Sequence, residues 1–213
     1  MTSIGLISDV HAEAEALTEA FSIFMQAGVD DIFCAGDIAG YMDELDQSIK
    51  LLIEHDCKTV VGNHDLTYLQ NNEGESNDSI SYLKKLPVSY EALIEGKKIY
   101  MVHAQPPDSC HGGIKLLDKH GEIMHDRLEQ WAEMLSSFDY DVLIVGHTHQ
   151  VFVEKIADML VINPGSTAFN NCCAILRLPE MSVDLYPLAG KKIQRTWNWG
   201  CLLYTSDAAD DFA

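Results

Sequence analysis

The sequence has 213 residues, enough for one domain with a substantial hydrophobic core, whereas two domains would each be small. Hydrophobic residues make up 47% of the chain, and no apolar run approaches the length of a membrane span. The formal net charge of −19 disfavours a broad nucleic-acid-binding surface, because such a surface needs clustered Lys and Arg. Neither a membrane nor a nucleic-acid polymer is therefore expected as a partner.

The N-terminus and the cysteines favour a cytoplasmic protein. The first ten residues contain no basic leader, and Asp9 comes too early for a secretory signal peptide. None of the six cysteines forms a CxxC pair, and Cys172 and Cys173 are adjacent, which is poor geometry for a disulfide. We expect reduced thiols in the cytoplasm.

The first 61 residues alternate between strand and helix patterns. Short apolar runs that end in polar residues predict strands, and apolar residues at helical spacing predict helices. The expected elements are a strand at 4–9, a helix at 12–27, a strand at 31–35, a helix at 43–54 and a strand at 59–61. This alternation indicates parallel β-α-β units.

The remainder of the chain is richer in strand patterns. Glu95-Gly96-Lys97 predicts the turn of a hairpin between two strands. The expected elements are a helix at 79–85, strands at 90–94 and 98–103, a loop at 104–113, a helix at 126–136, and strands at 142–145, 151–153, 159–162, 173–178 and 182–186.

No repeat or linker divides the chain, so residues 1–200 are expected to form one domain. Residues 201–213 are expected to be foreign, because they resemble the translation of a sequencing adapter.

Polar blocks recur directly after the predicted strands. In open α/β sheets, ligands bind at the carboxyl ends of strands, so these blocks are expected to converge. Each block alone is a weak signal, because a single Asp or His at a strand end is usually a cap or a turn residue. The series of five is a strong signal: Asp9-Val10-His11, Gly36-Asp37, Gly62-Asn63-His64-Asp65, His103 and Gly146-His147-Thr148-His149.

Imidazole, carboxylate and amide donors together suit Mn, Fe, Zn or Ni better than a Ca or Mg cage. The number of donors fits two neighbouring cations, which require a shared anionic ligand such as a carboxylate. We therefore expect two divalent transition-metal ions as cofactors, Mn first, with Fe, Ni or Zn as alternatives.

The five blocks, in this order, resemble the calcineurin-like metallophosphoesterase superfamily, especially its small bacterial and archaeal phosphodiesterases. The resemblance extends over residues 2–190. It implies an α/β fold, a four-layer α/β/β/α sandwich with two mixed β-sheets and the metals between the ends of the sheets.

The resemblance also implies a role for each polar residue. The first metal would be held by Asp9, His11, Asp37 and His149, and the second by Asp37 as the bridge together with Asn63, His103 and His147. His64 would act as general acid or transition-state stabiliser, oriented by Asp65. The segment 163–166, Asn-Pro-Gly-Ser, resembles the closing turn of the family, which is a structural feature.

The chain departs from the family pattern at two places. Asp37 is followed by Ile38-Ala39-Gly40, and the Gly62–Asp65 block ends in Asp65. Both features disfavour the protein Ser/Thr phosphatase and dinucleoside tetraphosphatase branches. The usual Gly after the fourth block is Ala104, which restricts the backbone beside His103.

Four further histidines lie outside the pattern. His55, His120 and His125 are expected to be solvated, and His111 in a Gly-rich loop is a candidate substrate contact.

These features predict a dinuclear metal-dependent phosphoesterase that hydrolyses a small phosphodiester through a metal-bridging hydroxide. Three alternatives are a phosphomonoesterase or nucleotide phosphatase of the same fold, a noncatalytic interaction scaffold, and a nuclease. The acidic charge disfavours the nuclease, and the intact set of donors disfavours the scaffold. The sequence leaves the natural substrate and homo-oligomer formation open.

Overall fold

A computed structural model describes residues 1–197, and the expected foreign tail, residues 201–213, lies outside this part. The helices are α1 (Ala14–Ala27), α2 (Leu45–Glu54), α3 (Asn63–Asn71), α4 (Asp78–Leu83) and α5 (His125–Leu135). The strands are β1 (Thr2–Ile7), β2 (Asp31–Cys34), β3 (Lys58–Thr59), β4 (Ser89–Ile94), β5 (Lys97–Val102), β6 (Val142–Ile144), β7 (Val151–Ile156), β8 (Met159–Pro164), β9 (Cys172–Leu178) and β10 (Ser182–Pro187).

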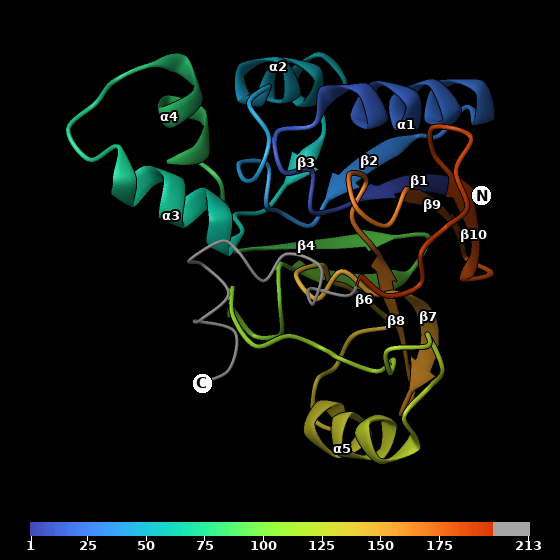
Figure 1. Cartoon of the computed structure of the whole chain (residues 1–213). Helices are drawn as coiled ribbons and strands as arrows, with labels where there is room; N and C mark the ends of the chain where they lie inside the picture. The colour runs from blue at the N-terminus through green and yellow to red at the C-terminus, as the bar shows by residue number, and fades with distance from the viewer. Residues whose placement is uncertain (198–213) are drawn as a thin grey trace.

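The strands form two mixed sheets with the orders β10-β9-β1-β2-β3 and β4-β5-β6-β8-β7. Strands β1, β2 and β3 are parallel, as the alternation of strand and helix patterns predicts, and β9 joins β1 in antiparallel orientation. Helices α1 and α2 cover the outer face of the first sheet, and α5 covers the outer face of the second (Figure 1). The expected four-layer α/β/β/α sandwich is confirmed.

Three hydrophobic clusters separate the four layers. One cluster fills the space between α1, α2 and the first sheet, and another lies under α5. The cluster between the two sheets joins Ile4, Leu6 and Phe33 of the first sheet to Ile99, Met101 and Ile144 of the second. Each of these six side chains is at most 1% exposed, so apolar packing holds the two sheets together. The polar residues lie at the ends of the strands, outside this cluster.

Helix α1 shows how local sequence positions these layers. Its start is capped by the Glu13 carboxylate, which accepts a hydrogen bond from the Ala16 N–H at 2.8 Å. Leu17, Phe21 and Phe24 lie on one face of the helix and are buried against the first sheet. The helix ends at Ala27, as predicted, and Gly28 caps it in a left-handed conformation.

The structure differs from the predicted elements around residue 60. Strand β3 contains only Lys58 and Thr59, and the backbone N–H of Val61 donates to the Pro87 carbonyl instead of continuing the ladder. Helix α3 follows at once and was not predicted. Asp65 is its only buried residue, so α3 has no apolar stripe that periodicity could reveal. No helix within residues 1–197 is long and apolar enough to cross a membrane.

Candidate metal centre

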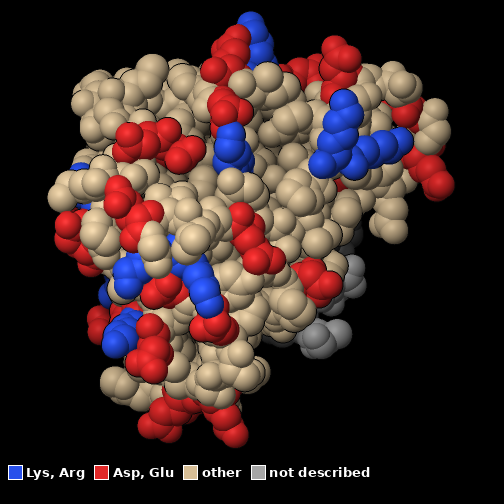
Figure 2. Space-filling view, turned by 180° about the vertical axis from the view of Figure 1, so that it is seen from behind, with Lys and Arg blue, Asp and Glu red and all other residues tan. Residues whose placement is uncertain are grey.

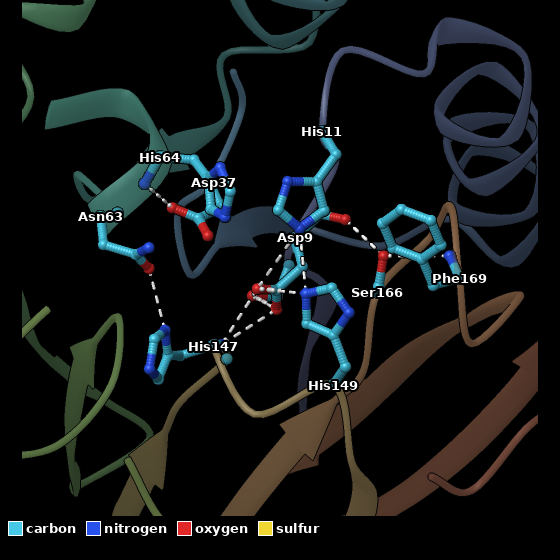
Figure 3. A network of polar contacts seen from close by, with 12 residues as sticks. Asp9, His11, Asp37, Asn63, His64, His147, His149, Ser166 and Phe169 are labelled. Carbon is cyan, nitrogen blue, oxygen red and sulfur yellow. Dashed lines mark hydrogen bonds and ion pairs between the residues drawn. The ribbon is translucent and has the colours of Figure 1, made fainter. Parts of the chain in front are cut away.

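The seven predicted metal ligands lie together where strands of both sheets end, and Figure 3 labels all of them except His103. Those from the first sheet follow β1, β2 and β3, and those from the second follow β5 and β6. Five of them have left-handed backbone conformations, with φ between 48° and 65°: Asp9, His11, Asp37, His147 and His149. Such conformations are unfavourable for non-glycine residues and tend to cluster at functional sites, where the surrounding structure holds them.

One group of donors comes from the segments after β1 and β6. The Nε2 atoms of His11 and His149 are 2.9 Å apart. Asp9 Oδ1 lies 3.4 Å from His149 Nε2 and 4.0 Å from His11 Nε2. Three potential ligand atoms therefore face a common point, and all three side chains are almost completely buried.

A second group forms around the amide of Asn63. Its Oδ1 atom lies 2.9 Å from His147 Nδ1 and 3.0 Å from His103 Nε2. Asp37 Oδ2 is 3.3 Å from the same His103 nitrogen. Asp37 also lies within ligand distance of His11, so this carboxylate stands between the two groups.

Backbone contacts orient the donors of the second group. His103 Nδ1 is 2.7 Å from the Ala35 carbonyl, an acceptor that requires a proton on Nδ1 and turns Nε2 toward the site. Asp37 Oδ1 accepts the His64 backbone N–H at 2.8 Å, which leaves Oδ2 toward the centre. Gly62 must lack a side chain, because a Cβ there would lie 2.0 Å from Asp37 Oδ1.

Burial and close charges shift the pKa values of these groups in opposite directions. Burial raises the pKa of Asp37, but the neighbouring His103 more than compensates and lowers it to about 2. Burial lowers the pKa of His103, but Asp37 and Asp9 together raise it to about 9. Burial and His149 lower the pKa of His11 to about 3. Two close imidazole nitrogens beside ionised carboxylates suit a divalent transition metal, so the residues fit the expected cofactors.

Asp65 does not orient His64, and that expectation is wrong. Its carboxylate is fully buried, with Oδ1 accepting the Ala39 N–H at 2.8 Å and Oδ2 accepting the Gly62 N–H at 2.9 Å. The reason is its position in the first turn of α3, from which the side chain bends back to the start of the helix, as in a capping box. Asp65 therefore joins the loop after β2 to the loop after β3.

His64 is half-buried and points toward the first group. Its ring centroid lies 4.9 Å from that of His11 and 4.8 Å from that of Tyr41. His64 also forms a potential ligand triad with His11 and Asp37. Its position allows two roles, a proton donor beside the metals or a ligand, and only an experiment that separates metal content from turnover distinguishes them.

Two aromatic residues near the site were missed by sequence reasoning. The rings of Tyr41 and Phe169 lie 4.9 and 5.4 Å from His11. Tyr41 is close to the Asp37 block in sequence, and this proximity was the available signal. Phe169 follows the 163–166 turn, in which Asn163 Nδ2 donates to the Gly146 carbonyl at 3.0 Å, a structural contact.

The four histidines outside the predicted site differ in how exposed they are. His111 is exposed at the edge of the second group, with its ring 6.5 Å from that of His147. His120 and His125 are exposed, as expected. His55 is half-buried and stacks on Phe21 at 4.2 Å, so the expectation that it is solvated is wrong.

Comparison with known proteins assigns the chain to a family. Residues 2–176 match the model of the calcineurin-like phosphoesterase superfamily domain. The chain belongs to this family. It is therefore a phosphoesterase of the metallophosphoesterase type, a family whose members use divalent metal ions.

Curated relatives of this metallophosphoesterase come from archaea and bacteria. Phosphodiesterase MJ0936 of Methanocaldococcus jannaschii is 28% identical over 81% of this chain and 86% of its own length. Uncharacterized protein MJ0912 of the same organism is also 28% identical, over 76% of this chain and 68% of its own.

Solved structures show the same fold at lower identity. Hypothetical protein PH1004 of Pyrococcus horikoshii OT3 has a TM-score of 0.69 and 17% identity, over 92% of this chain and 90% of its own. A metallophosphoesterase of Sphaerobacter thermophilus has a TM-score of 0.64 and 21% identity, over 91% of this chain and 90% of its own.

The family's usual Gly after the fourth block is Ala104 in this metallophosphoesterase. Ala104 is completely buried, is not among the residues with positive φ, and donates its N–H to the Ser109 carbonyl at 3.1 Å. Alanine therefore fits the backbone at this position, and His103 still points into the site.

Proposed function

We propose that this metallophosphoesterase hydrolyses a small phosphodiester with the help of two divalent transition-metal ions, Mn in the first place. The first ion would be held by Asp9, His11 and His149, and the second by Asn63, His103 and His147, with Asp37 shared between them. The observation that carries this proposal is the convergence of two donor groups on either side of one carboxylate. Bound there, two such ions would activate a water molecule near neutral pH and neutralise phosphoryl oxygens.

His64 would supply the proton that the departing alcohol needs. It lies beside His11 on the edge of the first group and is partly exposed, so a substrate oxygen and solvent can both reach it. General acid catalysis of this kind typically contributes about 10²–10⁴-fold in rate.

The electrostatics favour a diester over a monoester. The side chains that lower the pKa of Asp9 and Asp37 are imidazoles, those of His149, His103 and His11, and not Lys or Arg. Six Lys and Arg side chains form ion pairs with carboxylates that lie outside the site. These basic residues are Lys50, Lys58, Lys97, Lys98, Lys155 and Arg177. A diester carries one negative charge at neutral pH, so it requires less compensation than a doubly charged monoester.

The charge distribution on the surface supports a small substrate. On the face seen in Figure 2, Lys and Arg are scattered among more numerous Asp and Glu side chains. Such a face repels a polyanion.

The five described cysteines are free thiols, which agrees with the proposed cytoplasmic location.

The decisive experiment compares bis-p-nitrophenyl phosphate with p-nitrophenyl phosphate in the presence of Mn, Ni or Zn, together with the metal content of the protein. We expect two Mn per chain and a higher kcat/KM for the diester. A protein that takes up no metal under these conditions would point to the noncatalytic scaffold, and a preference for the monoester would point to the phosphatase alternative.

Replacement of His64 by Ala tests the assignment of the proton donor. Turnover should fall by about 10²–10⁴-fold while two Mn remain bound. His120→Ala, a change at an exposed histidine, is the matched control and should leave both quantities unchanged. A His64→Ala protein that loses metal in proportion to turnover would show that His64 is a ligand.

A further inference from the structure

Ser8 lies directly before the first ligand and belongs to none of the predicted donor sets. Its side chain is completely buried, and its hydroxyl donates a hydrogen bond of 2.6 Å to Asp9 Oδ2. The distance is typical of a hydroxyl–carboxylate bond, which is among the stronger hydrogen bonds in proteins. Ser8 therefore acts on the carboxylate of Asp9.

This contact makes the two carboxylate oxygens of Asp9 unequal. Oδ2 accepts the Ser8 hydroxyl and also lies 3.1 Å from the His147 backbone N–H. Oδ1 lies 3.0 Å from the same N–H but faces the imidazoles, at 3.4 Å from His149 Nε2. With Oδ2 engaged by the hydroxyl, Oδ1 is the oxygen presented to the first donor group.

Two loops, after β6 and after β8, hold Ser8 and Asp9 in place. A Cβ on Gly146 would lie 1.9 Å from Ser8 Oγ and 2.7 Å from Asp9 Oδ2, so only glycine allows the loop after β6 to approach. The Ser166 hydroxyl donates to the Asp9 carbonyl at 2.5 Å, and the Thr167 N–H donates to the Ser8 carbonyl at 3.3 Å. Segments of both sheets therefore meet at this pair, and Figure 3 shows Asp9 and Ser166 close together.

We infer that Ser8 is a positioning residue that fixes Asp9 as a one-oxygen ligand of the first metal. The inference rests on the proposed dinuclear centre. Without the hydroxyl, Oδ2 keeps only the backbone N–H that it shares with Oδ1, and the carboxylate can rotate away from the imidazoles. Loss of such a supporting contact typically weakens metal binding by about 10–100-fold. The second donor group does not include Asp9 and should keep its affinity.

The test measures metal binding directly in Ser8→Ala. Metal-free protein is equilibrated with Mn at fixed free concentrations set by a chelator, and bound Mn per chain is counted. Low-temperature electron paramagnetic resonance then shows whether the two ions are magnetically coupled. We expect one site unchanged, the other weakened about 10–100-fold, and the coupled signal lost at Mn concentrations that saturate the wild type.

Ser48→Ala is the matched control, because Ser48 is also completely buried but its hydroxyl has no hydrogen-bond partner among residues 1–197. It should bind two Mn as the wild type does. Two Mn with wild-type affinity and a coupled signal in Ser8→Ala would overturn the inference. Failure of the wild type and Ser48→Ala to hold two ions would instead refute the proposed function.

A second variant covers the case in which Ser8→Ala does not fold, as judged by circular dichroism. Gly146→Ala leaves Ser8 in the sequence but places a methyl group 1.9 Å from the Ser8 oxygen, which must move. The displaced hydroxyl should cause the same selective loss at one Mn site. Wild-type affinity at both sites in a folded Gly146→Ala protein would overturn the inference equally.

Discussion

The buried carboxylate of Asp65 gives the sharpest test of how the site is held together. Asp65→Ala removes the acceptor of two backbone N–H groups, those of Ala39 and Gly62. Both donors are then buried without this hydrogen-bond partner. A buried donor without a partner costs about 1–3 kcal/mol, so the two together cost about 2–6 kcal/mol. The expected effect is therefore primarily on folding.

Part of this loss is offset by relief of an unfavourable charge. Burial raises the pKa of Asp65 to about 7, and the nearby Asp37 contributes in the same direction, so the ionised carboxylate is itself costly in the folded protein. The two lost hydrogen bonds outweigh this relief because they join two loops of the site. We expect a net decrease of about 2–4 kcal/mol in the free energy of unfolding, a large share of the ~5–15 kcal/mol typical of a domain.

The assay is urea unfolding of the metal-free protein, followed by circular dichroism. The midpoint should fall while the dependence on urea stays the same. Asp78→Ala, at an exposed position in the first turn of α4, removes a favourable helix-terminal charge and should cost no more than about 1 kcal/mol. A loss below about 1 kcal/mol for Asp65→Ala, with a large fall in kcat, would refute this reasoning and restore Asp65 as the partner of His64.

Two other perturbations act on the metal ligands themselves. Gly62→Ala places a Cβ 2.0 Å from Asp37 Oδ1, so the shared carboxylate must move. We expect elemental analysis to show the loss of at least one Mn per chain. Retention of both ions would contradict the assigned geometry. Addition of Mn at about 100 times its Kd should raise the stability of the metal-free protein by about 2.7 kcal/mol for each site that it fills, seen as a higher melting temperature. Chelator should reverse the shift, and no shift would mean that the folded protein does not bind the metal.

Much of the fold follows from local patterns in the sequence. The apolar runs before Asp9, Asp37 and His103 end where their polar blocks begin, and each forms the predicted strand. The assignment of strands to sheets could not be predicted in this way. Strands β7 to β10 have similar patterns, yet β7 and β8 join the second sheet while β9 and β10 join the first. Tertiary packing, which acts between residues distant in sequence, decides which of the two sheets each strand joins.

The donor atoms of the site were easier to predict than their supports. Asp, His and Asn stand out after apolar strands, and the structure brings all seven predicted ligands together. Ser8 carries no comparable signal, because a serine at a strand end has common structural uses. Asp65 stands out as part of its block, but the block does not reveal that its carboxylate caps the start of a helix. Their contacts, with Asp9 Oδ2 and with the Ala39 N–H, become visible only when separate loops are placed in space.

Contacts within the fold hold the donor groups in position. Five ligands adopt strained left-handed backbone conformations, which persist only where the surrounding structure imposes them. Asp65, Ser8 and Ser166 impose them by joining loops across the sheet ends, and the apolar cluster between the sheets fixes the distance between those ends. The fold therefore carries the cost of organising the ligands, unlike a small zinc domain that folds only with its metal. It follows that removal of metal should lower the melting temperature but leave the secondary structure intact.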